Sequence, residues 1–433
     1  MTEITILGTG MAALGAAYKS SQENCVSTLY DKNPHPGGHT ASWATDEGFV
    51  FDEGPHISFT GDERLQELFA SNVDGAFENF AASVNNYWQG HWVKHPAQCN
   101  LHGLPTSLIV DVLRDFMQAQ YTEPGEINNY ADWLIASYGK SFAETFPMEY
   151  GHRYHTTTAD NMSTDWLGPR LYRPKVDEIL KGALDPVTED VHYVSKFRYP
   201  SQGGFVSYLN KFIENSNLKL SHRLVELDPV SKQLRFENGN QVKYKNIVSS
   251  IPLPELIPMI VGVPDNVLEA ANKLACTSCM TVNIGVDRED ISPAHWTYFY
   301  DKDFIFTRLS FPHMFAPGNA REGTGSIQAE IYFSKKYKPL EYTPEQCIDK
   351  TISDLQRCGL LRTDDNILYK GVRKIDYANI IFDLDRQEAV KIVHDYLADN
   401  KIHVAGRYGH WGYHWTDESF KSGEVAVEQI LGA

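Results

Sequence analysis

The first 31 residues place a strand, a glycine turn, a helix and a second strand in an order that strongly limits the fold. The run Glu3–Leu7 (EITIL) is apolar and rich in β-branched residues, as expected of a buried parallel strand. A Gly-Thr-Gly turn at residues 8–10 follows, and the next segment, AALGAAYKSS, has helical periodicity. CVSTLYD then predicts a second strand that ends at Asp31. This order predicts an α/β protein that begins with a Rossmann-type dinucleotide-binding unit.

Each part of this motif has a physical reason. Gly8 permits a tight turn after the strand, and Gly10 lets the backbone approach a pyrophosphate without a Cβ atom between them. The helix predicted to begin near Met11 directs its N-terminal N–H groups and the positive end of its dipole toward that pyrophosphate. Asp31 follows Gly10 by 21 residues, close to the ~20 expected for an acid that binds a ribose. Ala13 replaces the third glycine, which the motif tolerates.

The charge of the chain excludes one class of function. The 433 residues include 39 Lys and Arg against 56 Asp and Glu, a formal net charge of −17. This balance argues against a general nucleic-acid binder, which needs a basic surface, but it leaves room for a local basic pocket. Hydrophobic residues make up 42% and charged residues 22%, as in a folded globular protein. At ~150 residues per domain, the length predicts two or three domains.

The number of cysteines and the length of the apolar runs argue against a disulfide-rich protein and against a membrane-spanning one. Six cysteines are too few for a disulfide scaffold in a chain of this length. Cys276 and Cys279 form a CxxC pair without a second pair or a histidine cluster. We therefore expect buried thiols and no metal site, with a redox or metal role as the weaker alternative. No apolar run reaches ~18 residues and the N-terminus lacks signal-peptide features, so we expect a cytoplasmic protein without a transmembrane segment.

The segments after Asp31 indicate which dinucleotide is bound. KNPHPGGHTASW follows directly, and GFVFDEGPHISF comes soon after it. With the glycine motif, these segments resemble the FAD-binding start of the superfamily of amine oxidases, protoporphyrinogen oxidase and UDP-galactopyranose mutase. In that superfamily a Gly-Gly-x-x-x-Ser loop lies near the cofactor phosphates, and an Asp-Gly segment passes the flavin. The resemblance implies FAD as cofactor, with contacts from Gly8, Gly10, Met11, Ala12, Ala13, Asp31, Lys32, Gly37, Gly38, His39, Thr40, Gly54, Pro55 and His56.

Two later segments extend the resemblance. LSHRLVELDP predicts a strand whose counterpart in the superfamily holds the adenine end of FAD by backbone contacts, which assigns Val225 to that end. Near the C-terminus, the strand IHVA leads into Gly406 and Arg407, and a helix is predicted to start near Asp417 or Ser419. In the superfamily this loop covers the flavin, and the helix N-terminus faces the pyrimidine end of the ring. A helix N-terminus would stabilise the negative charge of a reduced flavin.

The resemblance divides the chain into two interleaved domains. Residues 1–75, 195–250 and 385–433 form a discontinuous Rossmann-type FAD-binding domain, and residues 76–194 and 251–384 form an inserted α+β substrate domain. The second inserted piece predicts a mixed or antiparallel sheet from the strands MTVNIGVD, TYFYD, FIFTRLSF and SIQAEIYF. Its segment EQCIDKTISDLQRCGLL predicts a helix.

Four residues favour the mutase branch of the superfamily. His56 lies in GPHISF, which is similar to a mutase stretch with a histidine beside the flavin. Arg170 ends WLGPR, and Arg308 lies in FIFTRLSF; both resemble mutase arginines that reach the substrate. Tyr413 ends GRYGHWGY, similar to the loop with the mutase substrate tyrosine. Guanidinium groups suit a diphosphate because they donate paired hydrogen bonds. The alternative for the arginines is pairing with a buried acid such as Glu330.

The chain also departs from the mutase pattern. His155 stands in place of a tryptophan, Arg170 and Arg173 are three rather than four residues apart, and Asn379 stands in place of a tyrosine. We therefore predict a FAD-dependent oxidoreductase that transfers hydride between flavin and a polar small molecule, such as a nucleotide sugar or an amine. The alternatives are a mutase-like isomerase that uses reduced flavin as a nucleophile, and a non-catalytic flavin-binding protein. The sequence leaves the substrate, the electron acceptor and the oligomeric state open.

Overall fold

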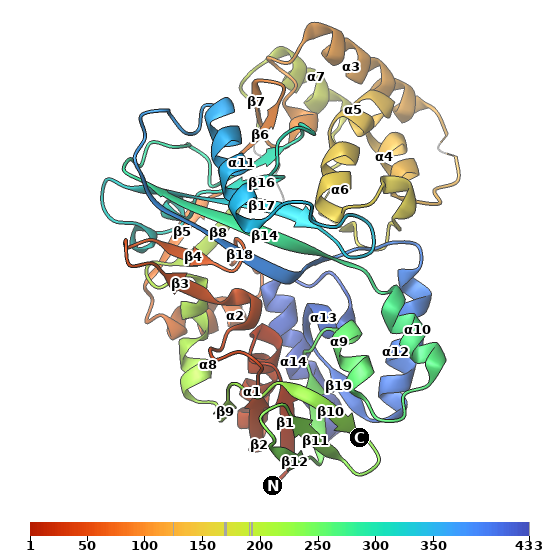
Figure 1. Cartoon of the computed structure of the whole chain (residues 1–433). Helices are drawn as coiled ribbons and strands as arrows, with labels where there is room; N and C mark the ends of the chain where they lie inside the picture. Colours follow the sequence, from red (N-terminus) through yellow and green to blue (C-terminus); the bar gives the residue numbers. More distant parts are fainter. Residues whose placement is uncertain (124, 169–170, 190, 192–193, 433) are drawn as a thin grey trace.

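The chain folds around two sheets that lie one above the other in Figure 1. The computed structural model describes residues 1–123, 125–168, 171–189, 191 and 194–432. The lower sheet lies near both chain ends, and a group of helices lies beside the upper sheet. In the described part of the chain, no helix combines the length and the apolar character needed to cross a membrane.

The lower sheet has five parallel strands in the order β19, β13, β1, β2, β9. Their bounds are β1 Glu3–Leu7, β2 Val26–Tyr30, β9 Leu218–Lys219, β13 Asn246–Ser249 and β19 Ile402–Val404. Strands β2 and β9 lie on one side of β1 in the sheet, and strands β13 and β19 lie on the other side. The order reverses at β1, and doubly wound sheets bind ligands at the carboxyl ends of the strands around such a point. The predicted Rossmann-type unit is confirmed.

Two helices on this sheet are in backbone contact. Helix α1, Met11–Gln22, connects β1 to β2, and it packs against the last helix, α14, Thr416–Leu431. A Cβ atom at Gly15 would overlap the carbonyl oxygen of Phe420, and a Cβ atom at Gly423 would overlap that of Ala12. The C-terminal helix is therefore held tightly against the first helix of the chain.

The upper sheet has seven strands in the order β18, β14, β17, β16, β15, β6, β7. Their bounds are β6 Val84–Trp88, β7 His91–Lys94, β14 Cys276–Val286, β15 Trp296–Phe299, β16 Arg308–Ser310, β17 Gly325–Phe333 and β18 Ile367–Ile380. The pairing of β15 with β6 is parallel, and the other pairings are antiparallel. The sequence predicted a mixed or an antiparallel sheet, and the observed sheet is mixed.

Strand β18, which has 14 residues, is not predicted from the sequence. This strand lies at the edge of the sheet and carries Lys370, Arg373, Lys374 and Asp376. These charges interrupt the apolar alternation by which a strand is recognised. Charged side chains suit an edge strand because they oppose pairing with another chain. In the predicted strand FIFTRLSF, only residues 308–310 are extended in the sheet.

Helices pack on the upper sheet and beside it (Figure 1). The group beside the sheet comprises α3 Thr106–Tyr121, α4 Tyr130–Tyr138, α5 Lys140–Thr145, α6 Pro147–His155 and α7 Val176–Leu184. Helix α11, Pro344–Arg357, agrees with the helix predicted from EQCIDKTISDLQRCGLL. Its buried residues Cys347 and Leu355 share a core with Val282 and Ile284 of β14.

The remaining elements are shorter or connect the two sheets. They are β3 Ser42–Ala44, β4 Val50–Asp52, β5 Phe77–Ala81, β8 Lys196–Pro200, β10 Leu224–Asp228, β11 Gln233–Phe236, β12 Gln241–Lys243, α2 Glu63–Asn72, α8 Asn210–Glu214, α9 Leu253–Leu256, α10 Asp265–Lys273, α12 Arg386–Asp399 and α13 Gly406–His410. All strands of the parallel sheet come from the ranges predicted for the FAD-binding domain, and all strands of the seven-stranded sheet come from the ranges predicted for the substrate domain. Helix α10 nevertheless packs against α12 beside the parallel sheet, so the boundary at residue 250 stays a prediction.

The contact between α1 and α14 predicts an unusual effect of alanine. Gly423→Ala should lower the free energy of unfolding by about 1–3 kcal/mol, because the added methyl must push the two helices apart. Alanine normally stabilises a helix interior relative to glycine, so the expected sign is reversed. Urea denaturation of the variant measures the change.

The matched control is Gly61→Ala, since a Cβ atom there meets no other atom within 4 Å. This substitution should leave the stability unchanged or raise it slightly. A Gly423→Ala protein at least as stable as the parent would contradict the close packing.

Candidate functional site

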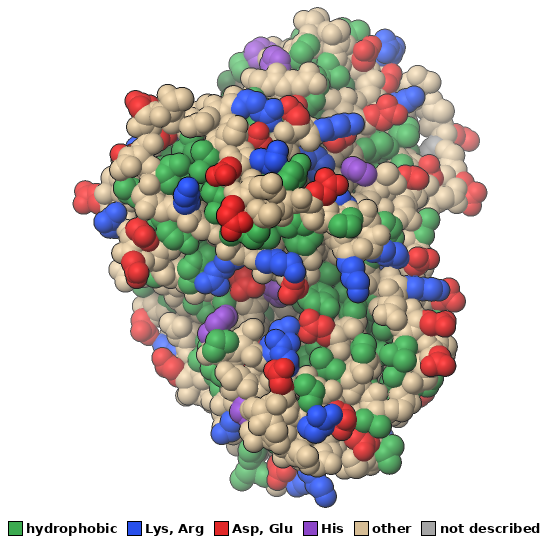
Figure 2. All heavy atoms as spheres, in the orientation of Figure 1, with side chains coloured by type: hydrophobic (Ala, Val, Ile, Leu, Met, Phe, Trp, Pro, Cys, Tyr) green, Lys and Arg blue, Asp and Glu red, His purple; other side chains and the backbone are tan. Residues whose placement is uncertain are grey.

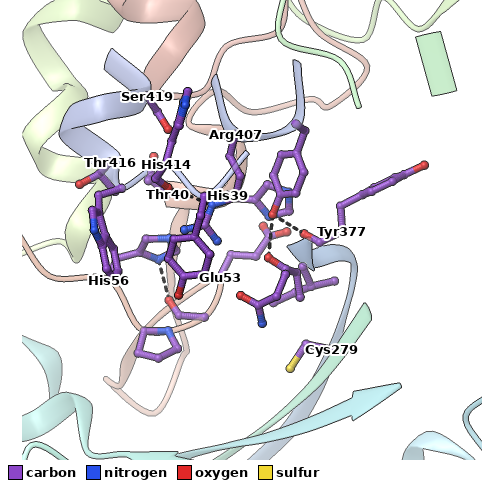
Figure 3. Close-up of a pocket in the computed structure, with 18 of the residues that line it drawn as sticks. His39, Thr40, Glu53, His56, Cys279, Tyr377, Arg407, His414, Thr416 and Ser419 are labelled. Atoms are coloured by element: carbon purple, nitrogen blue, oxygen red, sulfur yellow. Dashed lines mark hydrogen bonds between the residues drawn. The ribbon is translucent and has the colours of Figure 1, made fainter. Parts of the chain in front are cut away.

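A cavity of about 720 Å³ lies between the two sheets. Loops at the carboxyl ends of β1, β2, β13 and β19 line its lower wall, and side chains from α6, β14, β15, β16 and β17 line its upper wall. Figure 3 shows part of this lining in close-up. The volume falls in the range of ~300–1,000 Å³ that is usual for sites of small molecules and cofactors.

Two glycine loops meet at the start of the lower wall. Gly8 has a φ of 113°, and a Cβ atom there would overlap the Ser250 hydroxyl. The Gly8 N–H donates to the Tyr30 carbonyl oxygen at 2.7 Å, which closes the turn after β1. Gly10 lies against Gly38, where a Cβ atom would come within 3.0 Å of the Gly10 Cα. The loops therefore present bare backbone to the cavity.

The N-terminus of α1 is open to the cavity. Its N-cap, Gly10, makes no side-chain hydrogen bond, the first turn has no acidic residue, and Met11 and Ala12 line the cavity. A Cβ atom at Gly10 would meet only the backbone of Gly37 and Gly38, at 3.7 Å. The space in front of Gly10 is thus not filled by protein. The free N–H groups of a helix N-terminus bind anions, so this geometry fits a pyrophosphate.

Asp31 is held in place at the end of β2. The Thr9 hydroxyl donates to Oδ2 at 2.6 Å, and the Asn33 N–H donates to Oδ1 at 2.8 Å. Asp31 is mostly buried and lines the cavity. Each carboxylate oxygen has a further lone pair, so the group can accept hydrogen bonds from a ribose as the sequence predicted.

The C-terminal segment brings a second helix N-terminus to the same cavity. Gly406 has a φ of 78°, and a Cβ atom there would lie 2.8 Å from the Cβ of Ala12. Helix α14 begins at Thr416, close to the predicted start, and both Thr416 and Ser419 line the cavity. Asp417 lies in the first turn of α14 but not in the cavity wall. The cavity therefore receives the positive ends of α1 and α14 together.

His56 is fixed by a hydrogen bond to its own loop. Its Nδ1 lies 2.8 Å from the Gly54 carbonyl oxygen, and the bond is drawn in Figure 3. A carbonyl oxygen only accepts, so Nδ1 carries the hydrogen and Nε2 keeps its lone pair. Burial is the main cause that lowers the pKa of His56 to about 4; the Gly54 hydrogen bond opposes it, and the nearby charges of Arg407 and Arg308 add to it. At neutral pH the ring is an uncharged acceptor in the cavity wall.

Arg308 and Glu330 form an ion pair on the upper wall. Nε and Nη2 of Arg308 donate to the two carboxylate oxygens of Glu330, and the Tyr332 hydroxyl donates to Oε1 at 3.0 Å. Arg308 is also 21% exposed at its side chain and lines the cavity. It therefore combines the two roles that the sequence left open, as a partner of Glu330 and as a residue of the cavity wall.

Tyr413 lies in an aromatic part of the wall. Its ring stacks on that of Trp166 with centroids 6.2 Å apart, and the Arg407 guanidinium lies 5.0 Å from the Tyr413 centroid. The Arg407 Nε donates to the His414 carbonyl oxygen at 2.9 Å, which orients the side chain.

Arg170 lies outside the described residues, so its proposed contact with substrate stays a prediction.

Most of the residues predicted from the sequence meet in this one cavity. Those in its wall are Gly8, Gly10, Met11, Ala12, Asp31, Lys32, Gly37, Gly38, His39, Thr40, Gly54, Pro55, His56, Arg308, Gly406, Arg407, Tyr413 and Ser419. Ala13 is buried inside the fold instead. Val225 lies on β10 beside Arg223 and Leu224, and these two neighbours are the ones in the wall.

Sequence reasoning missed several tyrosines of the upper wall. Tyr298 and Tyr300 lie two residues apart at β15, and Glu330 and Tyr332 do so on β17. Side chains at this spacing point to the same face of a strand, so the alternation in the sequence indicated that the members of each pair share a face. Nothing in the sequence showed which face would meet the cavity, because that depends on how the two sheets are stacked.

The two thiols of the CxxC pair differ in exposure: Cys279 is buried and lines the cavity, whereas Cys276 is half-buried. Cys276 and Cys279 are both free thiols on β14, and burial raises the pKa of Cys276 to about 12 and that of Cys279 well above its ordinary value. Among the residues that the structure describes, no group of three or more His, Cys, Asp or Glu is arranged to hold a metal ion. The raised pKa values keep both thiols protonated at neutral pH, and the predicted burial is met by Cys279 but only in part by Cys276.

Comparison with known proteins identifies the class of fold. Residues 6–71 match the family model of an NAD(P)-binding Rossmann-like domain. The structure of a reduced UDP-galactopyranose mutase is similar over 100% of this chain and 96% of that one, with a TM-score of 0.94 and 24% identity. A protein from Exiguobacterium sp. 255-15 assigned as a protoporphyrinogen oxidase covers 100% and 99%, with a TM-score of 0.77 and 16% identity.

A putrescine oxidase variant with redesigned cofactor binding is also similar, over 100% of both chains, with a TM-score of 0.66 and 12% identity. The chain therefore has the fold that these three structures share. Of these three structures, the mutase has the highest TM-score. At these identities the similarity establishes the fold.

The state of His56 predicts how stability depends on pH. In the unfolded chain a histidine has a pKa near 6.5, whereas that of folded His56 is about 4. As the pH falls from 6.5 toward 4, the unfolded state gains a proton that the folded state does not bind, so stability is lost on acidification. His56→Asn keeps a donor near the position of Nδ1 but does not titrate. Between pH 6.5 and 4.5 it should lose about 2 kcal/mol less than the parent.

The measurement is urea unfolding at the two pH values, with both proteins in the same cofactor state. His152→Asn, at an exposed position of α6, is the control and should behave like the parent. Equal losses in the parent and the His56 variant would show that His56 does not remain neutral in the fold.

Proposed function

We propose that this chain is a FAD-dependent enzyme that acts on a polar small molecule. The observation that carries the proposal is the single cavity into which the glycine loops, Asp31 and two helix N-termini open on one side, and Arg308 and a set of aromatic rings on the other. The lower wall supports binding of a dinucleotide, and the upper wall supports binding of a second, smaller molecule beside it. The similar fold of known flavoenzymes supports the same conclusion.

The residues present fit FAD along the whole lower wall. The N-termini of α1 and α14 would stabilise negative charge at the pyrophosphate and at the flavin, and Asp31 would orient a ribose through its hydroxyl groups. Arg223 and Leu224 would line the adenine end. When bound, FAD supplies a ring that accepts or returns a hydride and is nucleophilic in its reduced form.

The side chains of the upper wall would position the substrate. Neutral His56 offers the lone pair of Nε2 as an acceptor, and Arg308 offers positive charge while Glu330 fixes its orientation. Tyr154 and Tyr413 close the wall with aromatic rings, which exclude water from the reacting groups. The chain thus binds, orients and shields, and the bond chemistry is left to the cofactor.

Two reaction types are candidates for this site. The high TM-score with the reduced UDP-galactopyranose mutase favours a mutase-like isomerase acting on a nucleotide sugar. The departures at His155, Arg173 and Asn379 favour a changed substrate, and hydride transfer in an oxidoreductase is the second candidate. A non-catalytic flavin-binding protein is the outcome in which FAD binds but no substrate perturbs it.

FAD binding has a sharp test at Gly10. The variant Gly10→Ala should fold with the stability of the parent, because its methyl group meets only atoms at ordinary contact distance. It should bind FAD at least tenfold more weakly, since the methyl occupies the space that the pyrophosphate approaches. Equilibrium dialysis with FAD and urea unfolding measure the two quantities. Gly61→Ala is the control, and unchanged FAD affinity in Gly10→Ala would count against the proposed cofactor site.

The reaction type is tested by anaerobic flavin spectra with a panel of UDP- and dTDP-sugars, amines and porphyrinogens. An oxidoreductase should bleach the oxidised flavin with its substrate. A mutase should convert UDP-galactopyranose only after the flavin has been reduced, with no net oxidation and no oxygen consumption that depends on substrate. If FAD binds but every compound leaves both the spectrum and the sugar unchanged, the chain is not an enzyme for these classes.

A further inference from the structure

An ion pair crosses the lower part of the cavity at the end of β1. Lys32 follows β2, and Glu255 lies in α9, which follows β13. Strands β2 and β13 flank β1 on its two sides. The Lys32 Nζ donates to Oε1 and Oε2 of Glu255 at 3.4 and 3.2 Å. The pair therefore spans the carboxyl end of β1, where the glycine turn begins.

The pair lies where the cavity meets solvent. Both residues line the cavity, and their side chains are 37% and 26% exposed. Neighbouring strands lie about 4.8 Å apart, so the two strands that flank a third are roughly 10 Å apart, and only long side chains meet across it. A dinucleotide binds in the crevice outside the carboxyl ends of the strands at such a point. The pair therefore bridges the crevice that the pyrophosphate and ribose of FAD would occupy.

The backbone on each side of this bridge is fixed. The N–H and the hydroxyl of Ser250 both donate to the Leu7 carbonyl oxygen at 2.9 Å, which ties the segment before α9 to β1. On the other side, the Asp31 N–H donates to the Lys219 carbonyl oxygen at 3.1 Å. The two charged side chains can rotate while these segments stay in place. The bridge can therefore open by side-chain rotation alone.

The pair is of a kind that opens and closes readily. Ion pairs between partly exposed side chains are weak, because water and salt screen their attraction. Burial raises the pKa of Tyr377, and the charge of Glu255 adds to the rise, so this tyrosine of the upper wall lies near the carboxylate. Glu255 thus has neighbours on both walls, and its closed position over the crevice is supported from each.

We propose that the Lys32–Glu255 pair is a latch across the dinucleotide crevice, which must open before FAD enters or leaves. This rests on the proposed function, because FAD must occupy this cavity. A latch that opens for both steps slows binding and release by the same factor and leaves the Kd unchanged. A side chain that instead holds FAD directly would change the release rate and the Kd together.

The test compares two double variants of the full chain that keep the net charge of the parent. Lys32→Gln with Glu255→Gln removes the ion pair, and Lys32→Glu with Glu255→Lys restores it with reversed polarity. The control is Lys391→Gln with Asp395→Asn, which removes an exposed ion pair on α12, away from the cavity wall. Exchange of bound FAD against an excess of isotope-labelled FAD gives the release rate, and equilibrium dialysis gives the Kd. Each protein is measured at low and at high KCl concentration, and its folding is checked by urea unfolding.

At low salt the double glutamine variant should release FAD about threefold faster than the parent, with its Kd unchanged within about twofold. The charge-reversed variant should return to within about 1.5-fold of the parent release rate, because the pair can form again. The control should release FAD at the parent rate. At high KCl the parent should approach the double glutamine variant, since salt weakens the pair that only the parent has.

Three results would overturn the latch. A double glutamine variant that releases FAD at the parent rate would show that the pair does not limit exchange. A rise in its Kd that matches the faster release would assign Lys32 to direct contact with FAD, and the charge-reversed variant should then bind more weakly still. A charge-reversed variant as fast as the double glutamine variant would show that the ion pair itself is not the cause.

These failures are distinct from a failure of the proposed function. If the parent binds FAD and any of the three results is found, the latch is rejected and the cofactor site stands. If the parent shows no bound FAD in equilibrium dialysis, the proposed function and the latch are rejected together.

Discussion

The close contact of α1 with α14 is the constraint on which the site depends. Gly15 and Gly423 let the two backbones touch, so a helix from the start of the chain and a helix from its end begin at the same cavity. A larger side chain at either position would separate the helices and move one N-terminus away from the other. The parallel sheet supports this pair, because β1 leads into α1 and β19 leads toward α14.

The two walls of the cavity differ in how they present charge. The lower wall offers positive helix ends and bare glycine backbone, which together suit the phosphates of a dinucleotide. The upper wall presents charge at Arg308, which Glu330 holds in an ion pair, and many of its other residues are aromatic. Acidic and basic side chains are interspersed over the face of the molecule that Figure 2 shows, so the net charge of −17 forms no patch of one sign on this face.

The lower wall could be predicted from the sequence and much of the upper wall could not. Gly8, Gly10 and Asp31 act through local backbone geometry, which a short motif encodes, and the structure brings them together as expected. The upper wall depends on stacking two sheets and on a register between distant strands, which no short segment encodes. Strand β18 could not be predicted because its edge position allows charged residues, which interrupt the apolar alternation. The role of the tyrosines at β15 and β17 could not be predicted because the alternation does not show which face of the strand meets a cavity.

Hydrogen exchange measured by mass spectrometry, with and without FAD, tests the central claim most directly. If one cofactor spans both helix ends, FAD should slow exchange of the amides at residues 11–14 of α1 and at residues 416–419 of α14 together, with the same dependence on FAD concentration. The exposed helix α3 should exchange at the same rate in both conditions. Protection of only one helix N-terminus, or of neither, would contradict a shared dinucleotide site.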